Sequence, residues 1–65
     1  MTMGKHLKLL RVTEGWTQQE AADKIGIMQV MVSDYETNKK KPGLKTLKAM
    51  CIVYGVTLND FFEFI

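Results

Sequence analysis

The sequence has little of the chemistry on which disulfide, metal and membrane proteins depend. Among its 65 residues there is one cysteine, Cys51, and one histidine, His6. A lone cysteine excludes an intrachain disulfide and favours a reducing compartment. One cysteine and one histidine together supply too few ligands for a zinc site. The longest apolar run, residues 49–56, is about half of what a bilayer span needs, and basic residues interrupt the only early apolar stretch. We therefore expect a cytoplasmic protein with no signal peptide, membrane contact or metal.

The remaining composition is that of an ordinary globular chain. Hydrophobic residues make up 46% and charged residues 25%, which excludes a disordered protein. The length allows one domain, residues 1–65, with a small core. The formal net charge of +2 is mildly basic and does not by itself indicate a nucleic-acid partner.

The spacing of apolar residues is helical throughout, and no segment alternates with the period of a strand. Thr17-Gln18-Gln19-Glu20 is a capping box, in which Thr17 and Glu20 satisfy each other's backbone amides at a helix start. Glycines at 15, 26 and 55 fit helix ends, and Pro42 suits a first helical turn. The sequence thus predicts an all-α, compact five-helix bundle. Its expected helices span residues 4–14, 18–25, 29–37, 43–54 and 58–64.

The second and third expected helices have the features of a helix-turn-helix. Ala22 is small where the two helices must approach, and Gly26 follows four residues later at the tight turn. Val32 and Tyr35 are spaced to face the preceding helix, which leaves the opposite side of residues 29–34 exposed. Small-x₃-Gly with matched apolar positions inside a capped pair is a fairly specific pattern.

Nearly the whole chain resembles a known family, the lambda-repressor-like Cro/C1-type (Xre-type) DNA-binding domain. The matching residues are Leu10-Arg11, residues 17–20, Ala22, Ile25-Gly26-Ile27, residues 32–36, Lys41-Pro42, Leu44, Leu47 and residues 55–58. The resemblance implies a five-helix bundle whose third helix lies in the DNA major groove. It also implies that Gln18 meets a phosphate and that Arg11 and Glu36 form a partly buried ion pair between the first and third helices.

The chemistry of the exposed side of the third helix agrees with this implication. Gln29 can pair with the N6 and N7 edge of adenine, and Val30 can pack on a thymine methyl group. Asp34 can accept from a cytosine amino group, or it can repel a phosphate and exclude other registers. The expected DNA-binding residues are Gln18, Gln29, Val30, Ser33, Asp34, Asn38, Lys39, Lys40 and Lys41.

The expected function is therefore that of a sequence-specific transcriptional regulator that binds double-stranded DNA. Departures from the family pattern keep a second function open. No Lys or Arg lies between Met28 and Glu36, and Met28 replaces the usual Ser or Thr cap. With Val30 and Met31, Met28 makes the presumed DNA face unusually apolar. The alternative is a protein-interaction module of the same fold that pairs with another regulator through this helix. An enzyme is not indicated, because the sequence has no nucleophile–base pair, carboxylate pair or Gly-rich phosphate loop, and neither a cofactor nor a small-molecule ligand is expected.

Apolar residues near the C-terminus exceed what so small a bundle can bury. Phe61 fits the core, whereas Ile52, Phe62 and Ile65 are surplus and predict a two-fold homodimer acting on a roughly palindromic operator. The alternatives are that these residues wrap onto the first helix or that a longer parent chain covers them. The fourth expected helix has an apolar stripe on its inward side, formed by Leu44, Leu47, Cys51 and Tyr54. Trp16 is also expected in the core, and His6 on the surface.

Overall fold

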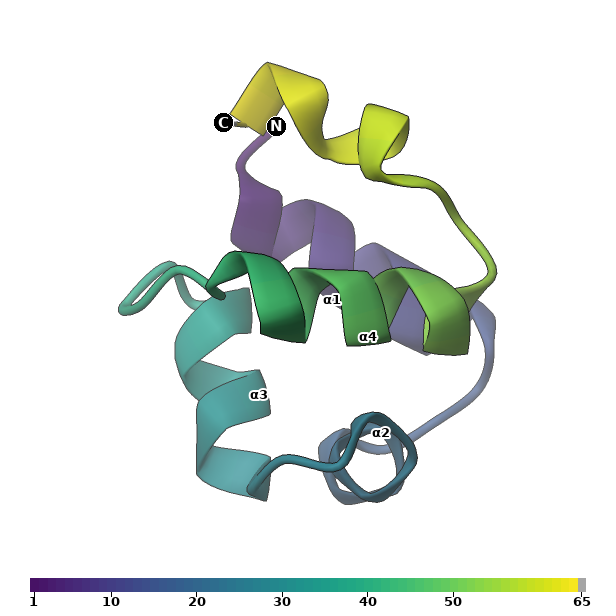
Figure 1. Cartoon of the computed structure of the whole chain (residues 1–65). Coiled ribbons are helices and arrows are strands. Elements are labelled where there is room, and N and C mark those ends of the chain that lie inside the picture. The colour runs from purple at the N-terminus through teal and green to yellow at the C-terminus, as the bar shows by residue number, and fades with distance from the viewer. Residues whose placement is uncertain (65) are drawn as a thin grey trace.

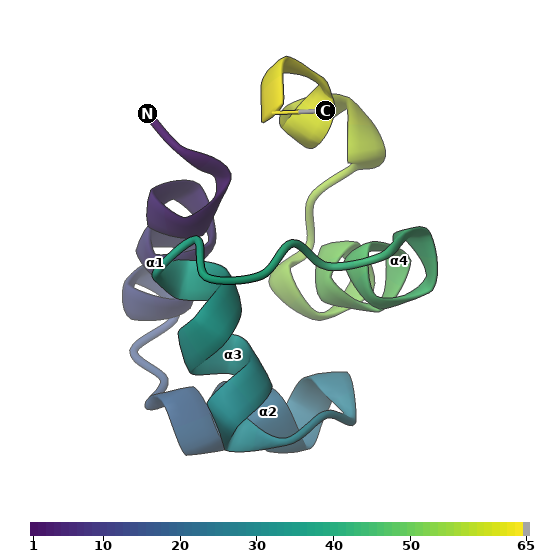
Figure 2. The same cartoon turned by 90° about the vertical axis from the view of Figure 1, so that its left-hand side faces the viewer.

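The computed structural model describes residues 1–64, which form four α-helices and one 3₁₀-helix and contain no strand. The helices are α1 (Met3–Thr13), α2 (Gln18–Ile25), α3 (Gln29–Glu36), α4 (Leu44–Tyr54) and the 3₁₀-helix η1 (Leu58–Phe64). The all-helical prediction is confirmed, and the observed bounds differ from the expected ones by at most one residue at each end. Figures 1 and 2 show α1 and α4 on opposite sides of the molecule, with α2 across one open end and η1 across the other. No helix in this part of the chain has the length and apolar character needed to cross a bilayer.

The α2–α3 pair begins and ends as the sequence predicts. The Thr17 hydroxyl accepts from the Glu20 amide at 3.1 Å, and a Glu20 carboxylate oxygen accepts from the Thr17 amide at 2.9 Å. Gly26 ends α2 at φ 87°, a left-handed conformation that a side chain would strain. Met28 precedes α3 and provides no side-chain hydrogen bond to it. Tertiary packing must therefore hold the start of α3 in place.

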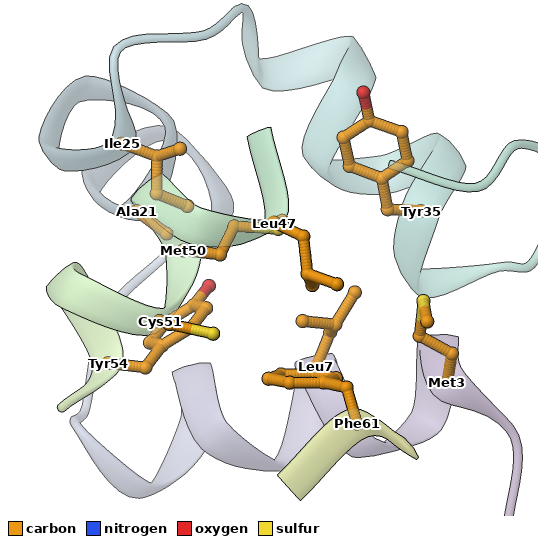
Figure 3. Close-up of a cluster of buried hydrophobic side chains, with 10 residues drawn as sticks. All are labelled: Met3, Leu7, Ala21, Ile25, Tyr35, Leu47, Met50, Cys51, Tyr54 and Phe61. Carbon is orange, nitrogen blue, oxygen red and sulfur yellow. The ribbon is translucent and has the colours of Figure 1, made fainter. Parts of the chain in front are cut away.

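The core lies between α1 and α4 and receives side chains from every helix. Phe61, Leu7, Met50 and Val32 are the largest side chains that are fully buried. Figure 3 shows side chains of α1, α4 and η1 meeting at one centre, with Tyr35 of α3 at its edge. Because Val32 and Tyr35 are buried, α3 is fixed to the bundle by one side, and its first turn on the other side is exposed to solvent.

The last helix is a 3₁₀-helix, and its register explains which aromatic residues are buried. In this conformation side chains three residues apart eclipse one another. Leu58, Phe61 and Phe64 therefore form one row against the core, while Phe62 lies in the next row and is 65% exposed. Ile65, the remaining residue of the predicted dimer surface, lies outside the described residues.

Two predictions for single residues in α1 and α4 are wrong. His6 is half-buried rather than on the surface, because η1 covers it: its ring lies 5.2 Å from that of Phe61 and 5.4 Å from that of Phe64. Leu44 was expected in the buried stripe of its helix, but it is 62% exposed at the first position of α4. In contrast, Cys51 and Tyr54 are buried as predicted, and Trp16 packs against the core.

The N-terminal turn of α1 lies directly against the C-terminal end of α3. A Cβ atom at Gly4 would stand 2.5 Å from the carbonyl oxygens of Tyr35 and Glu36, so only glycine fits this contact. Asn38, at φ 62°, follows α3, and its side-chain oxygen accepts from the Gly4 amide at 3.0 Å. Its amide nitrogen donates to the Thr2 hydroxyl at 2.9 Å. Asn38 thus joins the end of the helix-turn-helix to the start of α1.

Candidate nucleic-acid interface

The uncovered side of α3 presents both polar and apolar groups. Gln29 is exposed, Met28 is 68% exposed and Val30 is 52% exposed, whereas Val32 on the opposite side is 1% exposed. Ser33 and Asp34 are half-buried. The first turn is therefore the most exposed part of α3.

A buried ion pair holds α3 against α1. Arg11 donates from Nε to Glu36 Oε2 at 2.7 Å and from Nη2 to Glu36 Oε1 at 3.0 Å, a bidentate geometry. A third bond runs from Arg11 Nη1 to the Trp16 carbonyl oxygen at 2.7 Å. Arg11 is 9% and Glu36 is 8% exposed, so both charges are shielded from water. The hydrogen bonds to Glu36 raise the pKa of Arg11, which keeps the guanidinium group charged.

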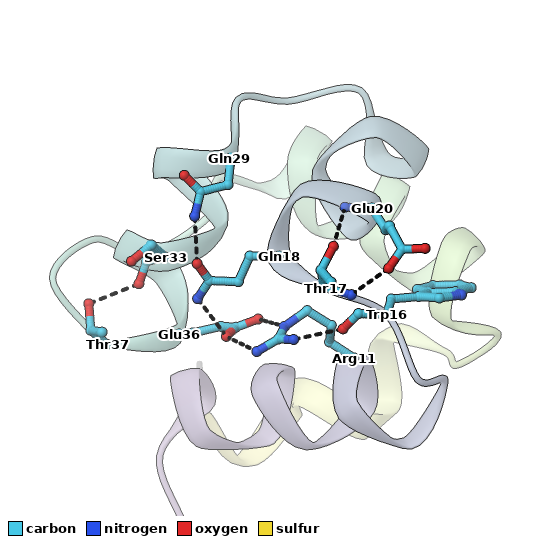
Figure 4. A network of polar contacts seen from close by, with 9 residues as sticks. All are labelled: Arg11, Trp16, Thr17, Gln18, Glu20, Gln29, Ser33, Glu36 and Thr37. Carbon is cyan, nitrogen blue, oxygen red and sulfur yellow. Dashed lines mark hydrogen bonds and ion pairs between the residues drawn. The ribbon is translucent and has the colours of Figure 1, made fainter.

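Two glutamine side chains connect this ion pair to the exposed end of α3 (Figure 4). Gln18, the first residue of α2, donates from Nε2 to Glu36 Oε1 at 3.2 Å. Its Oε1 accepts from Gln29 Nε2 at 2.6 Å. A continuous chain of hydrogen bonds thus runs from Arg11 through Glu36 and Gln18 to Gln29, across three helices.

The hydrogen-bonding capacity left on the two glutamines determines what they can bind. A side-chain amide has two N–H groups and one carbonyl oxygen. Gln29 uses one N–H on Gln18, so its other N–H and its oxygen remain available side by side, as the N7 acceptor and N6 donor of adenine require. Gln18 uses its oxygen and one N–H, which leaves one N–H as a donor for a phosphate oxygen.

The loop after α3 carries the positive charge of this region. Lys39, Lys40 and Lys41 are all exposed. Lys40 Nζ lies 3.9 Å from Asp34 Oδ2, and the Asp34 side chain is only 15% exposed. The Asp34 carbonyl oxygen also accepts from the amides of Lys39 and Lys40, at 2.9 and 3.2 Å. Asp34 therefore supports the lysine loop in this structure and is less open to a base than Gln29 or Val30.

Two site features were not expected from the sequence. The Gln18–Gln29 bond joins residues that are 11 positions apart, and Asn38, expected only as a DNA contact, also holds α1 and α3 together. The sequence signal for the first is a pair of amide residues at the starts of two helices joined by a tight turn. For the second, the signal is an Asn directly after a helix, where the left-handed conformation is common.

The described residues contain neither a candidate metal site nor a reactive cysteine. Across residues 1–64, no three His, Cys, Asp or Glu side chains come together as a metal site would require. Cys51 is buried and burial raises the pKa of its thiol, so it remains protonated at neutral pH and is a poor nucleophile.

Comparison with known proteins agrees with this geometry. A helix-turn-helix family profile matches residues 7–61. The chain is 36% identical over 60 residues to the HTH-type transcriptional regulator PuuR of Escherichia coli K12, covering 92% of this chain and 32% of that protein. It is 39% identical over 59 residues to the HTH-type transcriptional regulator ImmR of Bacillus subtilis, covering 91% of this chain and 46% of ImmR.

A third relative is the antitoxin HipB of Escherichia coli K12, 48% identical over 40 residues, which cover 62% of this chain and 46% of HipB. The chain thus spans a third to a half of the length of these three relatives. Their names describe regulators and an antitoxin rather than enzymes, in line with the absence of catalytic motifs from the sequence. On the profile match and the α2–α3 geometry together, the chain belongs to the Cro/C1-type helix-turn-helix family.

Proposed function

We propose that the chain is a cytoplasmic transcriptional regulator that binds double-stranded DNA with α3 in the major groove. The observation that carries this proposal is the exposed first turn of α3, where Gln29 is held by Gln18 with one N–H and one oxygen free. An α-helix fits the major groove, where each base pair presents a distinct pattern of donors and acceptors. The transcriptional regulators among the relatives support the same role.

Base readout falls to residues on the uncovered side of α3. Gln29 pairs with adenine, Val30 packs on a thymine methyl group, and Ser33 and Asp34 lie further along the groove. Replacing Gln29 with Ala should cost about 1–3 kcal/mol on the cognate site and relax one base position. An equal loss on random DNA would contradict a role for Gln29 in reading sequence.

Phosphate contacts position the domain on the duplex. Gln18 supplies its free N–H, Asn38 adds its remaining side-chain N–H, and Lys39, Lys40 and Lys41 supply charge. Because each neutralised phosphate releases a counterion, affinity should fall steeply as the salt concentration rises.

Alanine substitution at Lys39, Lys40 and Lys41 tests this role of the loop. The triple variant should weaken binding to all duplexes and flatten the salt slope. A matched triple variant at Lys8, Lys45 and Lys48, which are exposed on α1 and α4, removes the same charge away from the proposed interface and should change the slope less. Equal slopes for the two variants would remove the loop from the interface.

We also propose that the regulator binds as a homodimer. Ile52 is 82% and Phe62 is 65% exposed, and apolar groups this open are candidates for an interface. Ile65, the third residue of the proposed surface, follows Phe62 by three positions in the sequence. A two-fold dimer would present its α3 helices to half-sites about one helical turn, ~34 Å, apart. Phe62→Ser should weaken self-association in sedimentation equilibrium, whereas Leu9→Ser, at a 52% exposed position of α1, should leave it unchanged.

The decisive experiment is selection of bound sites from a random duplex pool at low ionic strength. Enrichment of an inverted repeat supports both the regulator and the dimer, and enrichment of a single half-site supports the regulator alone. A pool without any preferred sequence would refute sequence-specific binding.

One observation favours a second function, a protein-interaction module. Met28 and Val30 are both more than half exposed, and α3 contains no Lys or Arg. Apolar groups on a helix surface suit a groove in another regulator better than a phosphate backbone. This function predicts binding to a protein that is insensitive to salt and is lost in Met28→Gln. DNA binding instead predicts an affinity that falls as the salt concentration rises.

A further inference from the structure

A hollow of about 200 Å³ lies at the edge of the bundle, away from the exposed first turn of α3. Its lining comes from the start of α1, the end of the lysine loop, the first turns of α4 and the end of η1. The lining residues are Met3, Lys41, Pro42, Leu44, Leu47 and Phe64.

The lining is apolar except at one point. Leu47 is 3% and Met3 is 8% exposed, so they form the deeper part, while Leu44 is 62% exposed and leaves a large apolar surface open to water. Lys41 is the only charged residue among those that line the hollow, and no carboxylate of residues 1–64 lies within ion-pair distance of it. An apolar hollow with a single exposed lysine among its lining residues is chemically suited to a ligand with a hydrocarbon tail and one negative charge.

We propose that this hollow is a binding site for a small monocarboxylate with an aliphatic or aromatic tail. The tail lies against Leu44, Leu47 and Phe64, and the carboxylate lies beside Lys41 Nζ. The volume is smaller than the 300–1,000 Å³ typical of sites for drug-sized ligands, which restricts the tail to a short chain or a single ring.

Charge argues against a second copy of the chain as the occupant. A two-fold contact centred on the hollow would bring Lys41 of one copy towards Lys41 of the other, and close like charges oppose association. A carboxylate has the opposite effect, because it neutralises Lys41 while its tail removes the exposed part of Leu44 from water.

The site also has a consequence for the proposed function, on which this part of the inference rests. Lys41 is one of the three lysines assigned to the phosphate backbone. An ammonium group paired with a bound carboxylate is less available to a phosphate, so the ligand should weaken DNA binding. The carboxylate would then be a regulator of the lysine loop.

The test is a titration of the ¹⁵N-labelled protein with sodium octanoate, followed by amide chemical shifts. We expect saturable shifts at the residues of the hollow, with a dissociation constant in the millimolar range, because so small a ligand has few atoms in contact. Octanamide, which has the same tail without the charge, should bind roughly two- to fivefold more weakly, the effect of one exposed ion pair.

Paired variants separate the two parts of the site. Lys41→Gln should weaken octanoate binding to the level of octanamide, and Leu44→Gln should weaken both ligands. Lys45→Gln and Leu9→Gln remove an exposed lysine and an exposed leucine outside the hollow, and they should leave the dissociation constant unchanged. Leu9 lies in a second, more open hollow with Lys5, Lys8 and Val12. Leu9→Gln therefore also tests whether octanoate binds to any apolar hollow that has a lysine beside it.

Several results would overturn the proposal. These are equal affinity for octanoate and octanamide, unchanged octanoate binding in Lys41→Gln, and amide chemical shifts centred on Leu9. Shifts at the hollow that change with protein concentration in the absence of ligand would also overturn it, because they would assign the hollow to a second copy of the chain. Duplex affinity, measured in octanoate and in an equal concentration of sodium acetate, tests the regulatory step. Weaker affinity in octanoate supports that step, and equal affinity would refute it while the site itself stands. Failure to bind any duplex would count against the proposed function only.

Discussion

The buried pair of Arg11 and Glu36 should stabilise the fold as a unit. Breaking a buried pair by removing one partner costs about 3–5 kcal/mol, because the other charge is left without compensation. A domain of 65 residues has a total stability of about 3–10 kcal/mol, so either loss is a large fraction of it. Replacing both partners by apolar groups of similar size removes that penalty.

A double-mutant cycle tests this reasoning. We expect Arg11→Met and Glu36→Leu each to lower the free energy of unfolding by about 3–5 kcal/mol, and the double variant to lose no more than one of them does alone. Urea unfolding followed by circular dichroism measures each value, with an osmolyte such as sucrose added equally to all samples to keep the single variants folded.

The ion pair of Asp34 with Lys40, whose side chain is exposed, is the matched control. Its atoms are 3.9 Å apart and the Lys40 side chain is 67% exposed, so Lys40→Met should cost under about 1 kcal/mol. The reasoning is refuted if the losses of the two Arg11 and Glu36 single variants add up in the double variant, because additivity would mean that neither charge depends on the other.

Three other substitutions test features of the fold. Gly4→Ala should destabilise by about 1–3 kcal/mol in urea unfolding, although alanine is the better helix former, because its Cβ overlaps the carbonyl oxygens at the end of α3; a gain in stability would contradict the contact. Tyr54→Phe should stabilise by roughly 1 kcal/mol, because the Tyr54 hydroxyl is buried without a hydrogen-bond partner among residues 1–64, and a loss would reveal a partner. Burial raises the pKa of Tyr54 to about 12, so thermal stability should fall as the pH rises from about 10 towards 12, and Tyr54→Phe should remove this fall. Hydrogen bonds from Thr17 lower the pKa of Glu20, so the ionised Glu20 stabilises the fold above its unfolded pKa, and this stabilisation is lost as the pH falls through its folded pKa. Glu20→Gln should therefore reduce the loss of melting temperature at acid pH. An unchanged profile would exclude Glu20 as a cause of that loss.

The helices could be predicted because their signals are local. The capping box at Thr17 and Glu20 and the left-handed stop at Gly26 depend on residues within one turn of each other, and both are observed. The conformation of the last segment could not be predicted in this way. Phe61 and Phe62 fit a helix of either kind, and the 3₁₀ register, which buries one and exposes the other, is set by packing against His6 and the core.

The candidate site likewise has features that local sequence patterns predict and features that they do not. Which residues of α3 are exposed follows from the burial of Val32 and Tyr35, which the apolar spacing predicted. The bond between Gln18 and Gln29 and the close approach at Gly4 depend on how separate helices meet in space. Their sequence separations of 11 and more than 30 residues lie beyond any local pattern.

For the DNA binding that we propose, the tethered amide of Gln29 has a consequence for affinity and fidelity. A free glutamine samples many rotamers, and restricting it on association would oppose binding by about 1 kcal/mol. Here the restriction is met during folding, since Gln18 already holds the side chain in place. In the DNA complex that we propose, the entropy lost at the groove would therefore be smaller, and an incorrect base would meet a donor and an acceptor whose turning is opposed by the bond to Gln18.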